Sequence, residues 1–497
     1  MRLLLVNPPI TTLRYDVAPV LPPLGIMYIA AMARKRGHEV TIFDSVILGL
    51  KSPQEITNEE TGQSVIRYGA PDDVFLSLVA ELEPDVIGLS NIMAVTEKDC
   101  LYMAAAAKRA FPDVVIVIGG TNATARAEAL LMHDQVDFVF RGEGDSSFID
   151  FLDVIHSEEE RRRIPGICFK LNGESTISND IPVLHNLDEN PIPAWDLIDI
   201  PRYIEPPFPF SFHLREKVTT MVTSRGCVGN CLFCSGRKLL GSWRSRSPEN
   251  VIQEAQMLRD RHGIQEIQFL DSNISLNKKR FTDFLNLWHD QVKLVWAPVG
   301  GLYVQSLDSE IISQMSECGC HSFPLGIEGG NEKMQKYLGK IVPVEKVAEI
   351  CKVARQRGMW THGLFVIGFP GETGEDIYDI LRYAKRADLD SISMFAASPL
   401  PGSELYLEYI DDATFDPDLS RIVGNHFALA SLPREQLSSL RNNISRSFFL
   451  WKLLRELSPC SIFTRIRSPQ FKNMIHFIGK ALKRFLFLRT RDHQESS

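Results

Sequence analysis

The sequence predicts an α/β protein that consists of two successive sets of parallel strand–helix units and a helical tail. Short apolar segments of strand length alternate with amphipathic segments of helical length twice along the chain, and Gly-rich or acidic residues follow many of the strands. Three closely spaced cysteines, Cys227, Cys231 and Cys234, stand at the start of the second set. A chain of 497 residues with 44% hydrophobic residues is long enough for more than one packed core.

Residues 1–155 are expected to form a doubly wound, Rossmann-like sheet. The five segments with strand-like composition lie at 1–9, 40–44, 84–91, 114–120 and 136–145. An amphipathic helix is predicted over 23–40, where Gly37 ends it before the second strand. Parallel strands with helices between them place a ligand over the carboxyl ends of the strands.

Two of these strands end in glycine-rich tips, Gly119-Gly120-Thr121 and Gly142-Glu143-Gly144. Glycines at such tips let the backbone come close to a bulky ligand. A nucleotide is one candidate ligand, but no Gly-x-Gly-x-x-Gly motif follows the first strand, which weakens that interpretation.

Residues 156–215 are predicted to be a connector. The run from Glu158 to Arg163 is charged, and 190–210 is rich in proline and aromatic residues. This composition favours extended chain and turns. A plain linker is the default interpretation.

The cysteines follow the spacing Cys-x-x-x-Cys-x-x-Cys within 223–237, and no fourth cysteine or histidine lies close by in the sequence. A four-iron four-sulfur cluster needs four ligands, so three thiolates would leave one iron open. Structural zinc is an alternative, but it takes four ligands, typically as two separated pairs. His213 and His262 are poorly spaced to complete such a set. Three buried thiols without a metal are the remaining alternative.

The second set, 216–410, repeats a strand–helix rhythm that is typical of parallel β/α units. The predicted strands lie at 264–273, 321–330, 360–373 and 391–406, and helices are predicted at 248–263 and 342–358. Polar or glycine-rich residues close each strand, and in β/α barrels ligand groups gather at these carboxyl ends.

The cysteine loop, Phe233 before its third cysteine, and this order of strand ends resemble the radical S-adenosylmethionine (SAM) superfamily. The resemblance implies a partial (β/α)6 barrel of the TIM type and a cluster whose open iron binds SAM. Cys227, Cys231 and Cys234 would then hold the cluster. The residues implied in SAM binding are Phe233, Asp271, Asn273, Glu328, Gly329, Gly368 and Glu372.

The first domain is similar to the cobalamin-binding domain that precedes the barrel in one branch of that superfamily. The residues implied in cobalamin binding are Asn7, Pro8, Ser90, Gly119, Gly120, Thr121, Gly142, Glu143 and Gly144. The Asp-x-His-x-x-Gly motif that supplies a histidine to cobalt is missing, and Asn122 stands where many relatives carry histidine. Cobalamin is therefore expected to bind without a histidine below the corrin. Trp195 and Tyr203 of the connector are candidate contacts, because similar segments help to close the site in relatives.

The resemblance implies a methyltransferase that uses a 4Fe-4S cluster, SAM and cobalamin. The reduced cluster would cleave SAM to a 5′-deoxyadenosyl radical, and cobalamin would deliver a methyl group to an unactivated carbon. The alternatives are a cobalamin-dependent radical cyclase or oxidoreductase that transfers no methyl group, and a non-catalytic cobalamin-binding regulatory protein. A flavodoxin or ferredoxin is the expected electron donor.

The substrate is expected to be a large hydrophobic small molecule, such as a bacteriochlorophyll-type tetrapyrrole or an isoprenoid lipid. The aromatic connector and the basic tail favour this class. Gly300-Gly301-Leu302 stands where the family often carries an arginine, which would leave room for such a substrate.

The net charge and the cysteine content indicate which binding partners and which cellular compartment to expect. A net charge of −8 gives no case for nucleic-acid binding. The nine cysteines are odd in number and six of them are scattered, which suits a reducing cytosol and not a disulfide framework. We find no secretory signal or membrane-spanning run. The expected location is therefore cytoplasmic, with peripheral membrane contact through the tail as one alternative.

The C-terminal region, 411–497, is predicted to be helical. Within 469–488, apolar residues fall on one helical face and basic residues on the other. Such a helix can lie on an anionic membrane surface. A helix that caps the barrel and exposes its basic face to solvent is the alternative.

Overall fold

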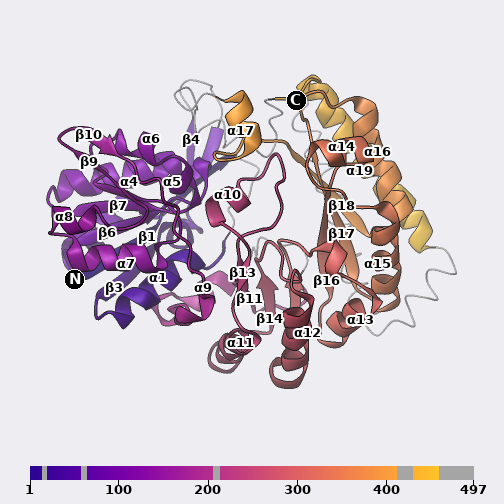
Figure 1. Ribbon diagram of the computed structural model, residues 1–497, viewed down its shortest axis with the longest axis horizontal. Coiled ribbons are helices and arrows are strands. Elements are labelled where there is room, and N and C mark those ends of the chain that lie inside the picture. Colours follow the sequence, from indigo (N-terminus) through magenta and orange to yellow (C-terminus); the bar gives the residue numbers. More distant parts are fainter. Residues whose placement is uncertain (14–19, 58–63, 205–212, 411–428, 458–497) are drawn as a thin grey trace. The chain divides into compact units, whose positions relative to one another are not determined.

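The computed structural model describes residues 1–13, 20–57, 64–204, 213–410 and 429–457 (Figure 1). The chain forms two compact units. Unit 1 takes its described residues from 1–204, 225–245 and 398–410, and unit 2 takes them from 213–224, 246–397 and 429–457. Each unit thus combines segments that are far apart in the sequence, and the cysteine loop belongs to unit 1.

Unit 1 is built on a seven-stranded sheet with the order β10-β9-β8-β7-β6-β1-β3 (Figure 1). The strands are β1 (Arg2–Asn7), β3 (Glu39–Asp44), β6 (Val86–Ser90), β7 (Val115–Gly119), β8 (Phe138–Phe140), β9 (Ile167–Leu171) and β10 (Glu174–Thr176). The first five pair in parallel, and β9 and β10 continue the sheet antiparallel. The five predicted strands all form, and the doubly wound fold is confirmed. Because β3 lies beyond β1, the strand order reverses between β1 and β6, which is where such sheets bind ligands.

Helices cover both faces of this sheet because its strands are apolar on both sides. In β1, Leu3 and Leu5 pack with α1 (Leu24–Lys35) and α7 (Gly144–Val154), and Leu4 and Val6 pack on the opposite face. The helices on that opposite face are α3 (Asp72–Leu82), α4 (Glu97–Ala110) and α6 (Ala127–Leu131). Gly37 follows α1 with a φ of 85°, in the left-handed region, as expected for a helix-ending glycine.

A second, antiparallel sheet of unit 1 was not predicted. Its order is β2-β5-β4, formed by β2 (Ile10–Leu13), β4 (Gln54–Thr57) and β5 (Ser64–Tyr68). These strands are short and carry polar residues, so they lack the apolar run that marks a buried strand. The other short elements of unit 1 are α2 (Ser45–Gly49), η1 (Ala94–Thr96), α5 (Thr121–Ala125), α8 (Glu158–Arg161), η2 (Leu187–Glu189), η3 (Trp195–Leu197), α9 (Ile200–Ile204), α10 (Gly236–Leu240), β13 (Arg244–Ser245) and α17 (Glu404–Tyr409).

Unit 2 contains six parallel strands in two three-stranded sheets, β11-β14-β15 and β16-β17-β18 (Figure 1). The strands are β11 (Val218–Met221), β14 (Glu266–Phe269), β15 (Val295–Pro298), β16 (Ser322–Glu328), β17 (Trp360–Ile367) and β18 (Ser391–Ala396). A parallel bridge between Trp296 and Cys320 connects the two sheets. This is the arrangement expected of a six-stranded partial barrel.

Helices follow these strands and are marked by local sequence signals. They are α11 (Pro248–His262), α12 (Lys278–Leu287), η4 (Trp288–Val292), η5 (Val304–Ser306), α13 (Ser309–Glu317), α14 (Glu332–Tyr337), α15 (Val344–Gln356), α16 (Gly374–Ala387) and α19 (Arg434–Glu456). Helix α11 begins after Ser247, whose hydroxyl accepts from the Asn250 N–H, and ends at Gly263 with a φ of 65°. The short strand β12 (Ser224–Arg225) leads into the cysteine loop.

The C-terminal region is helical where the structure describes it. Helix α19 packs against α16, and Lys452 of α19 forms ion pairs with Asp388 and Asp390. The predicted amphipathic helix 469–488 lies outside the described residues.

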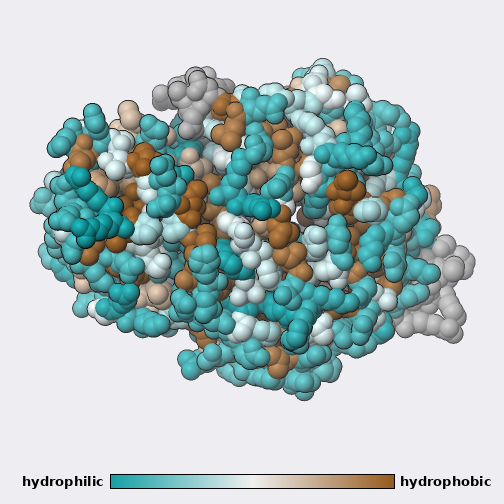
Figure 2. Space-filling view, in the orientation of Figure 1, coloured by the Kyte–Doolittle hydropathy of each residue, from teal (hydrophilic) through white to brown (hydrophobic). Residues whose placement is uncertain are grey.

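Figure 2 shows a mostly hydrophilic face with hydrophobic residues in small separate groups. No helix in the described ranges has the length and apolar character needed to cross a bilayer.

Candidate functional site

The switch point of the unit 1 sheet is lined by the ends of β1 and β6. Asn7 ends β1, and its amide Nδ2 donates to Asp44 Oδ1 at 3.0 Å. The Tyr203 hydroxyl donates to the other oxygen of Asp44 at 2.7 Å. Burial raises the pKa of the Asp44 carboxyl despite these hydrogen bonds. Ser90 ends β6 and is only partly buried, so this edge of the sheet offers both anchored and accessible polar groups.

The glycines at the two tips differ in whether the surrounding chain leaves room for a side chain. A Cβ on Gly119 would meet nothing within 4 Å. Gly120 has a φ of 115°, and a Cβ there would lie 2.6 Å from the Asn91 carbonyl oxygen. Gly142 has a φ of 79°, and its Cβ would lie 2.4 Å from the Pro182 carbonyl oxygen. The chain itself therefore requires glycine at 120 and 142, and only Gly119 faces open space. Gly120 and Gly142 thus have a reason within the fold to be glycine, and their contact with a ligand stays a prediction.

A buried polar network lies beneath the Gly119-Gly120-Thr121 tip. Asn122 Nδ2 donates to Asn91 Oδ1 at 2.6 Å and to Glu97 Oε2 at 2.8 Å. Arg126 Nε also donates to Glu97 Oε2 at 2.8 Å. The Asn122 amide is thus directed into the protein and not toward the open side of the tip. Thr121 in turn donates from its hydroxyl to the Ile92 carbonyl at 2.7 Å.

Three residues that build this network were not predicted from the sequence: Asn91, Glu97 and Arg126. Only their positions after β6 and near the Gly-rich tip could have signalled them. All three side chains are buried, and a buried charged pair such as Arg126–Glu97 persists only when its polar atoms are satisfied. The network fixes the backbone from which the tip projects.

The second tip is anchored through Glu143. Its Oε2 accepts from the Leu184 N–H at 2.6 Å and from Arg244 Nη1 at 2.9 Å. The carboxylate of Glu143 is therefore used within the protein, while Gly144 begins α7. Pro8, predicted for the same site, is buried directly after β1.

The cysteine loop lies in unit 1 and is closed by a hydrogen bond from the Cys227 N–H to the Gly241 carbonyl at 3.2 Å. Cys227 and Cys231 are partly exposed and Cys234 is exposed. By contrast, the other described cysteines are buried, and burial raises the pKa of their thiols: Cys100, Cys168, Cys318, Cys320 and Cys351. The loop thiols are thus the accessible ones. Phe233 is partly buried.

The donor set of the loop fits an iron–sulfur cluster. Backbone N–H groups point at two of the sulfurs, from Gly229 to Cys227 Sγ at 3.3 Å and from Gly236 to Cys234 Sγ at 3.4 Å. Such N–H donors stabilise thiolate ligands. Within the described ranges, no three His, Cys, Asp or Glu side chains stand together as a formed metal site. The structure thus brings the three thiols into one loop without arranging them as a closed coordination shell.

Asp271 follows β14 in unit 2 and is buried. Its two oxygens accept from the Thr223 N–H at 3.1 and 3.0 Å, and Oδ1 also accepts from the Thr223 and Ser224 hydroxyls. Burial raises the pKa of this carboxyl. Asp271 therefore holds the chain that leads into the cysteine loop. Asn273, two residues on, is only partly buried.

The ends of β16 and β17 carry the other predicted SAM residues. Glu328 has a φ of 68°, a strained value for a residue with a side chain, and its Oε1 lies 2.9 Å from Lys340 Nζ. Glu372 Oε2 accepts from the N–H groups of Gly368, at 2.5 Å, and Phe369, at 3.1 Å. Burial raises the pKa of Glu372 to about 7. Gly329 packs closely, since its Cβ would lie 2.9 Å from Met334 Cβ.

Two further expectations concern the connector and Gly300, and the one about Gly300 needs correction. Trp195 and Tyr203 are buried within unit 1, so the connector packs into the fold there, and their contact with a bound ligand stays a prediction. Gly300 does not leave room for a substrate, because its Cβ would lie 2.2 Å from the Asp271 carbonyl oxygen. The glycine is required by that close approach of two chain segments.

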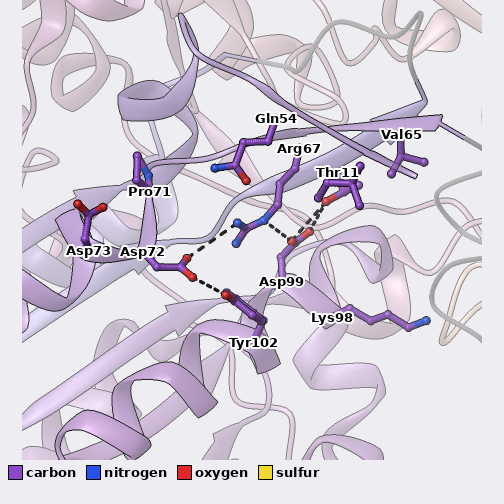
Figure 3. A pocket seen from close by; sticks show the side chains of 11 residues that line it. Thr11, Gln54, Val65, Arg67, Pro71, Asp72, Asp73, Lys98, Asp99 and Tyr102 are labelled. Atoms are coloured by element: carbon purple, nitrogen blue, oxygen red, sulfur yellow. Dashed lines mark hydrogen bonds and ion pairs between the residues drawn. The ribbon is translucent and has the colours of Figure 1, made fainter. Parts of the chain in front are cut away.

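Unit 1 also has a polar pocket of about 580 Å³ between the β2-β5-β4 sheet and the starts of α3 and α4 (Figure 3). Arg67 Nε lies 3.1 Å from Asp99 Oδ1, and the Thr11 hydroxyl donates to the same carboxylate. Asp72 accepts from the Tyr102 hydroxyl. Arg67 thus pairs with acidic groups of the same pocket, and none of the predicted cofactor residues lines it.

Comparison with known proteins identifies two families in the chain. Residues 10–152 match the B12 binding domain family, and residues 221–384 match the Radical SAM superfamily.

Three relatives are similar along most of the chain. Cytidylyl-2-hydroxyethylphosphonate methyltransferase of Streptomyces wedmorensis is 31% identical over 449 residues, which cover 84% of this chain and 83% of that protein. An uncharacterized methyltransferase of Pyrococcus horikoshii is 30% identical, with coverage of 90% and 93%. The anaerobic magnesium-protoporphyrin IX monomethyl ester cyclase of Synechocystis is 24% identical, with coverage of 82% and 77%.

Among solved structures, the fold is similar to that of the radical SAM methyltransferase TsrM of Kitasatospora setae. The TM-score is 0.65 at 16% identity, and the match covers 82% of this chain and 75% of that one. TsrM has also been solved with cobalamin and a [4Fe-4S] cluster bound. Because it contains a B12 binding domain and a radical SAM domain, the chain has cobalamin, SAM and a 4Fe-4S cluster as its cofactors. The chain belongs to the cobalamin-dependent radical SAM enzymes of the methyltransferase type.

Proposed function

We propose that this enzyme moves a methyl group from SAM, by way of cobalamin, to an unactivated carbon of a hydrophobic small molecule. The observation that carries the proposal is the joint presence of a cobalamin-type sheet and a three-thiol loop in a chain 31% identical to a named methyltransferase. When bound, the cofactors supply a carbon-centred radical and a transferable methyl group, and the protein supplies placement.

The cysteine loop would hold three irons through Cys227, Cys231 and Cys234. The N–H groups of Gly229 and Gly236 would stabilise the negative charge on the sulfurs. Hydrogen bonds of this kind to the sulfurs are among the features that set the potential of a cluster. A small protein of the flavodoxin or ferredoxin class is the proposed electron donor.

Among the predicted SAM residues, Glu328 is the strongest candidate for direct contact. Its backbone lies in the left-handed region, which is strained for a residue with a side chain. Strained residues persist only where the surrounding structure holds them, and they are concentrated at ligand-binding and active sites. The carboxylates of Asp271 and Glu372 already accept backbone N–H bonds. We therefore assign them to shaping the strand ends, while Asn273 and Gly329 remain candidates for contact.

The substrate class remains a prediction from the sequence pattern. The Streptomyces relative acts on a cytidylylated phosphonate, as its name states, whereas the Synechocystis relative acts on a magnesium-protoporphyrin ester. A tetrapyrrole side chain or an isoprenoid lipid is our proposal. The similarity to the cyclase keeps radical cyclisation without methyl transfer as the second candidate function.

Product analysis with methyl-deuterated SAM tests these functions. The reconstituted enzyme is incubated with a strong reductant and a panel of magnesium-protoporphyrin esters, isoprenoid lipids and cytidylylated phosphonates. Methyl transfer gives a labelled product together with 5′-deoxyadenosine. A cyclase gives an unlabelled product with 5′-deoxyadenosine, and a regulatory protein cleaves no SAM. Label only in the phosphonate would contradict the hydrophobic substrate.

A further inference from the structure

Four charged side chains join the second tip of the unit 1 sheet to the two short strands β12 and β13. These strands flank the segment that contains the cysteine loop and α10, and we call them the two ends of the loop. Glu143 and Asp145 follow β8, Arg225 precedes Cys227, and Arg244 follows α10. All four belong to unit 1. We call them the four-charge clamp.

Each pair of the clamp is bidentate. Arg225 Nη1 and Nη2 lie 2.7 and 3.0 Å from the two oxygens of Asp145. Arg244 Nη1 and Nη2 lie 2.9 and 3.1 Å from the two oxygens of Glu143. Arg225 also lies 3.5 Å from Glu143, which connects the two pairs. Such fork-to-fork pairs fix orientation as well as distance.

The clamp is shielded from water. The side chains of Arg244 and Glu143 are each 9% exposed, and those of Arg225 and Asp145 are 17% and 7% exposed. A buried charge without its partner is strongly unfavourable, so neither arginine can leave while its carboxylate stays. The tip and the loop must therefore move together or not at all.

Further hydrogen bonds extend this connection on both sides. Arg244 donates to the Leu184 carbonyl at 2.7 Å and to the Leu240 carbonyl, the last residue of α10, at 2.6 Å. The Asn190 amide donates to Asp145 at 2.6 Å. The connector is thus held against the clamp, and no predicted ligand of the cluster takes part in it.

We propose that the four-charge clamp couples the two cofactor sites energetically. The inference rests on the proposed function. Glu143 lies between Gly142 and Gly144 in the tip assigned to cobalamin, and Arg225 and Arg244 hold the two ends of the loop assigned to the cluster. Ordering of the loop around its cluster therefore preorganises the tip and raises its affinity for cobalamin. By thermodynamic reciprocity, cobalamin raises the affinity of the loop for the cluster by the same factor.

The test is the affinity of the full-length chain for hydroxocobalamin, measured by anaerobic equilibrium dialysis with and without a reconstituted cluster. For the wild type, the cluster should tighten binding by about fivefold or more, the usual lower range of such coupling. In Arg244→Gln the factor should fall below about twofold, and adding Glu143→Gln should change it no further, because the pair acts as one unit. Arg163→Gln, in an exposed pair with Glu159, is the matched control and should keep the wild-type factor.

Two results would overturn the coupling: a wild type whose affinity is independent of the cluster, or an Arg244→Gln protein with full iron content and an unchanged factor. If Arg244→Gln fails to fold, the charge-swapped pair Glu143→Arg with Arg244→Glu decides. If this double variant shows the coupling, the role of the clamp is supported. If it folds and shows no coupling, the role of the clamp is contradicted. A wild type that binds no hydroxocobalamin at all would overturn the proposed function and the clamp with it.

Discussion

Two adjacent glycines at the end of β7 allow a test of ligand binding to be distinguished from a test of backbone conformation. A valine at Gly119 would enter open space at the predicted cobalamin tip without backbone strain. We expect Gly119→Val to keep the wild-type midpoint of urea unfolding and to weaken hydroxocobalamin binding by at least about tenfold, since a corrin would meet the new side chain. Unchanged binding in a folded Gly119→Val protein would show that the corrin lies elsewhere.

Gly120→Ala is the matched comparison, and it should act on the fold. Its φ of 115° and the 2.6 Å approach to the Asn91 carbonyl leave no room for a methyl group. We expect a loss of about 1–3 kcal/mol in the free energy of unfolding, measured in urea. An alanine variant as stable as the wild type would contradict this account of the tip.

Glu372 should make stability depend on pH. Its pKa is raised from 4.5 to about 7, so the folded state holds this proton more tightly than the unfolded state. The resulting stabilisation is complete below the unfolded pKa and is lost as pH rises through about 7. Between about pH 5 and pH 8, the wild type should lose up to about 3 kcal/mol relative to Glu372→Gln, which cannot titrate.

The measurement is urea unfolding of both proteins at several pH values. The difference between their free energies of unfolding removes the contributions of all other titrating groups. A difference that does not change with pH would show that Glu372 titrates normally.

Asn122 stands where many relatives carry a histidine, and its side chain is bound within the protein. Its amide donates to Asn91 and Glu97, and the usual histidine-bearing motif is missing. The electron paramagnetic resonance spectrum of bound cob(II)alamin should therefore show no splitting from an axial nitrogen. A nitrogen splitting in the wild type would mean that a residue outside these expectations ligates cobalt.

At the scale of single elements, the cysteine loop carries the sharpest prediction. The protein with Cys227→Ala, Cys231→Ala and Cys234→Ala should show no cluster absorbance after anaerobic reconstitution, and no 5′-deoxyadenosine from SAM. Cys318→Ala, which changes a buried thiol elsewhere, should reconstitute normally. Iron content near that of the wild type in the triple variant would refute the assignment of these ligands.

Helices and strands followed local signals closely. Helix α11 begins at the proline after Ser247 and ends at Gly263, as the sequence pattern predicts. The β2-β5-β4 sheet escaped prediction because its stability depends on pairing between distant strands and not on an apolar run in any one of them.

At the scale of the whole molecule, the tail remains a prediction. If 469–488 is an interfacial helix, its basic residues should bind anionic vesicles, and each contributes about 1 kcal/mol near the surface. Removing 469–497 should then abolish sedimentation with such vesicles and leave SAM cleavage intact. A truncated protein that aggregates or loses its cofactors would show instead that the segment belongs to the fold.

The sequence by itself determined the fold class, and its resemblance to a known superfamily supplied the cofactors and the enzyme type. Strand–helix alternation reports the fold, since the periodicity of apolar residues is a local property. Cys227, Cys231 and Cys234 are close in sequence, so one loop must carry all three, whatever surrounds it. The missing cobalt-binding motif could be read in the same way.

Tertiary structure alone decided which polar groups are free and which are used internally. Asp271, Glu372 and Glu143 look like ligand-binding residues in the sequence, yet each carboxylate accepts N–H groups of the protein. The clamp residues Arg225 and Arg244 carry no sequence signal, because their partners lie far away along the chain. Hydrogen bonds and ion pairs depend on distances between remote segments, and such distances exist only once the chain has folded.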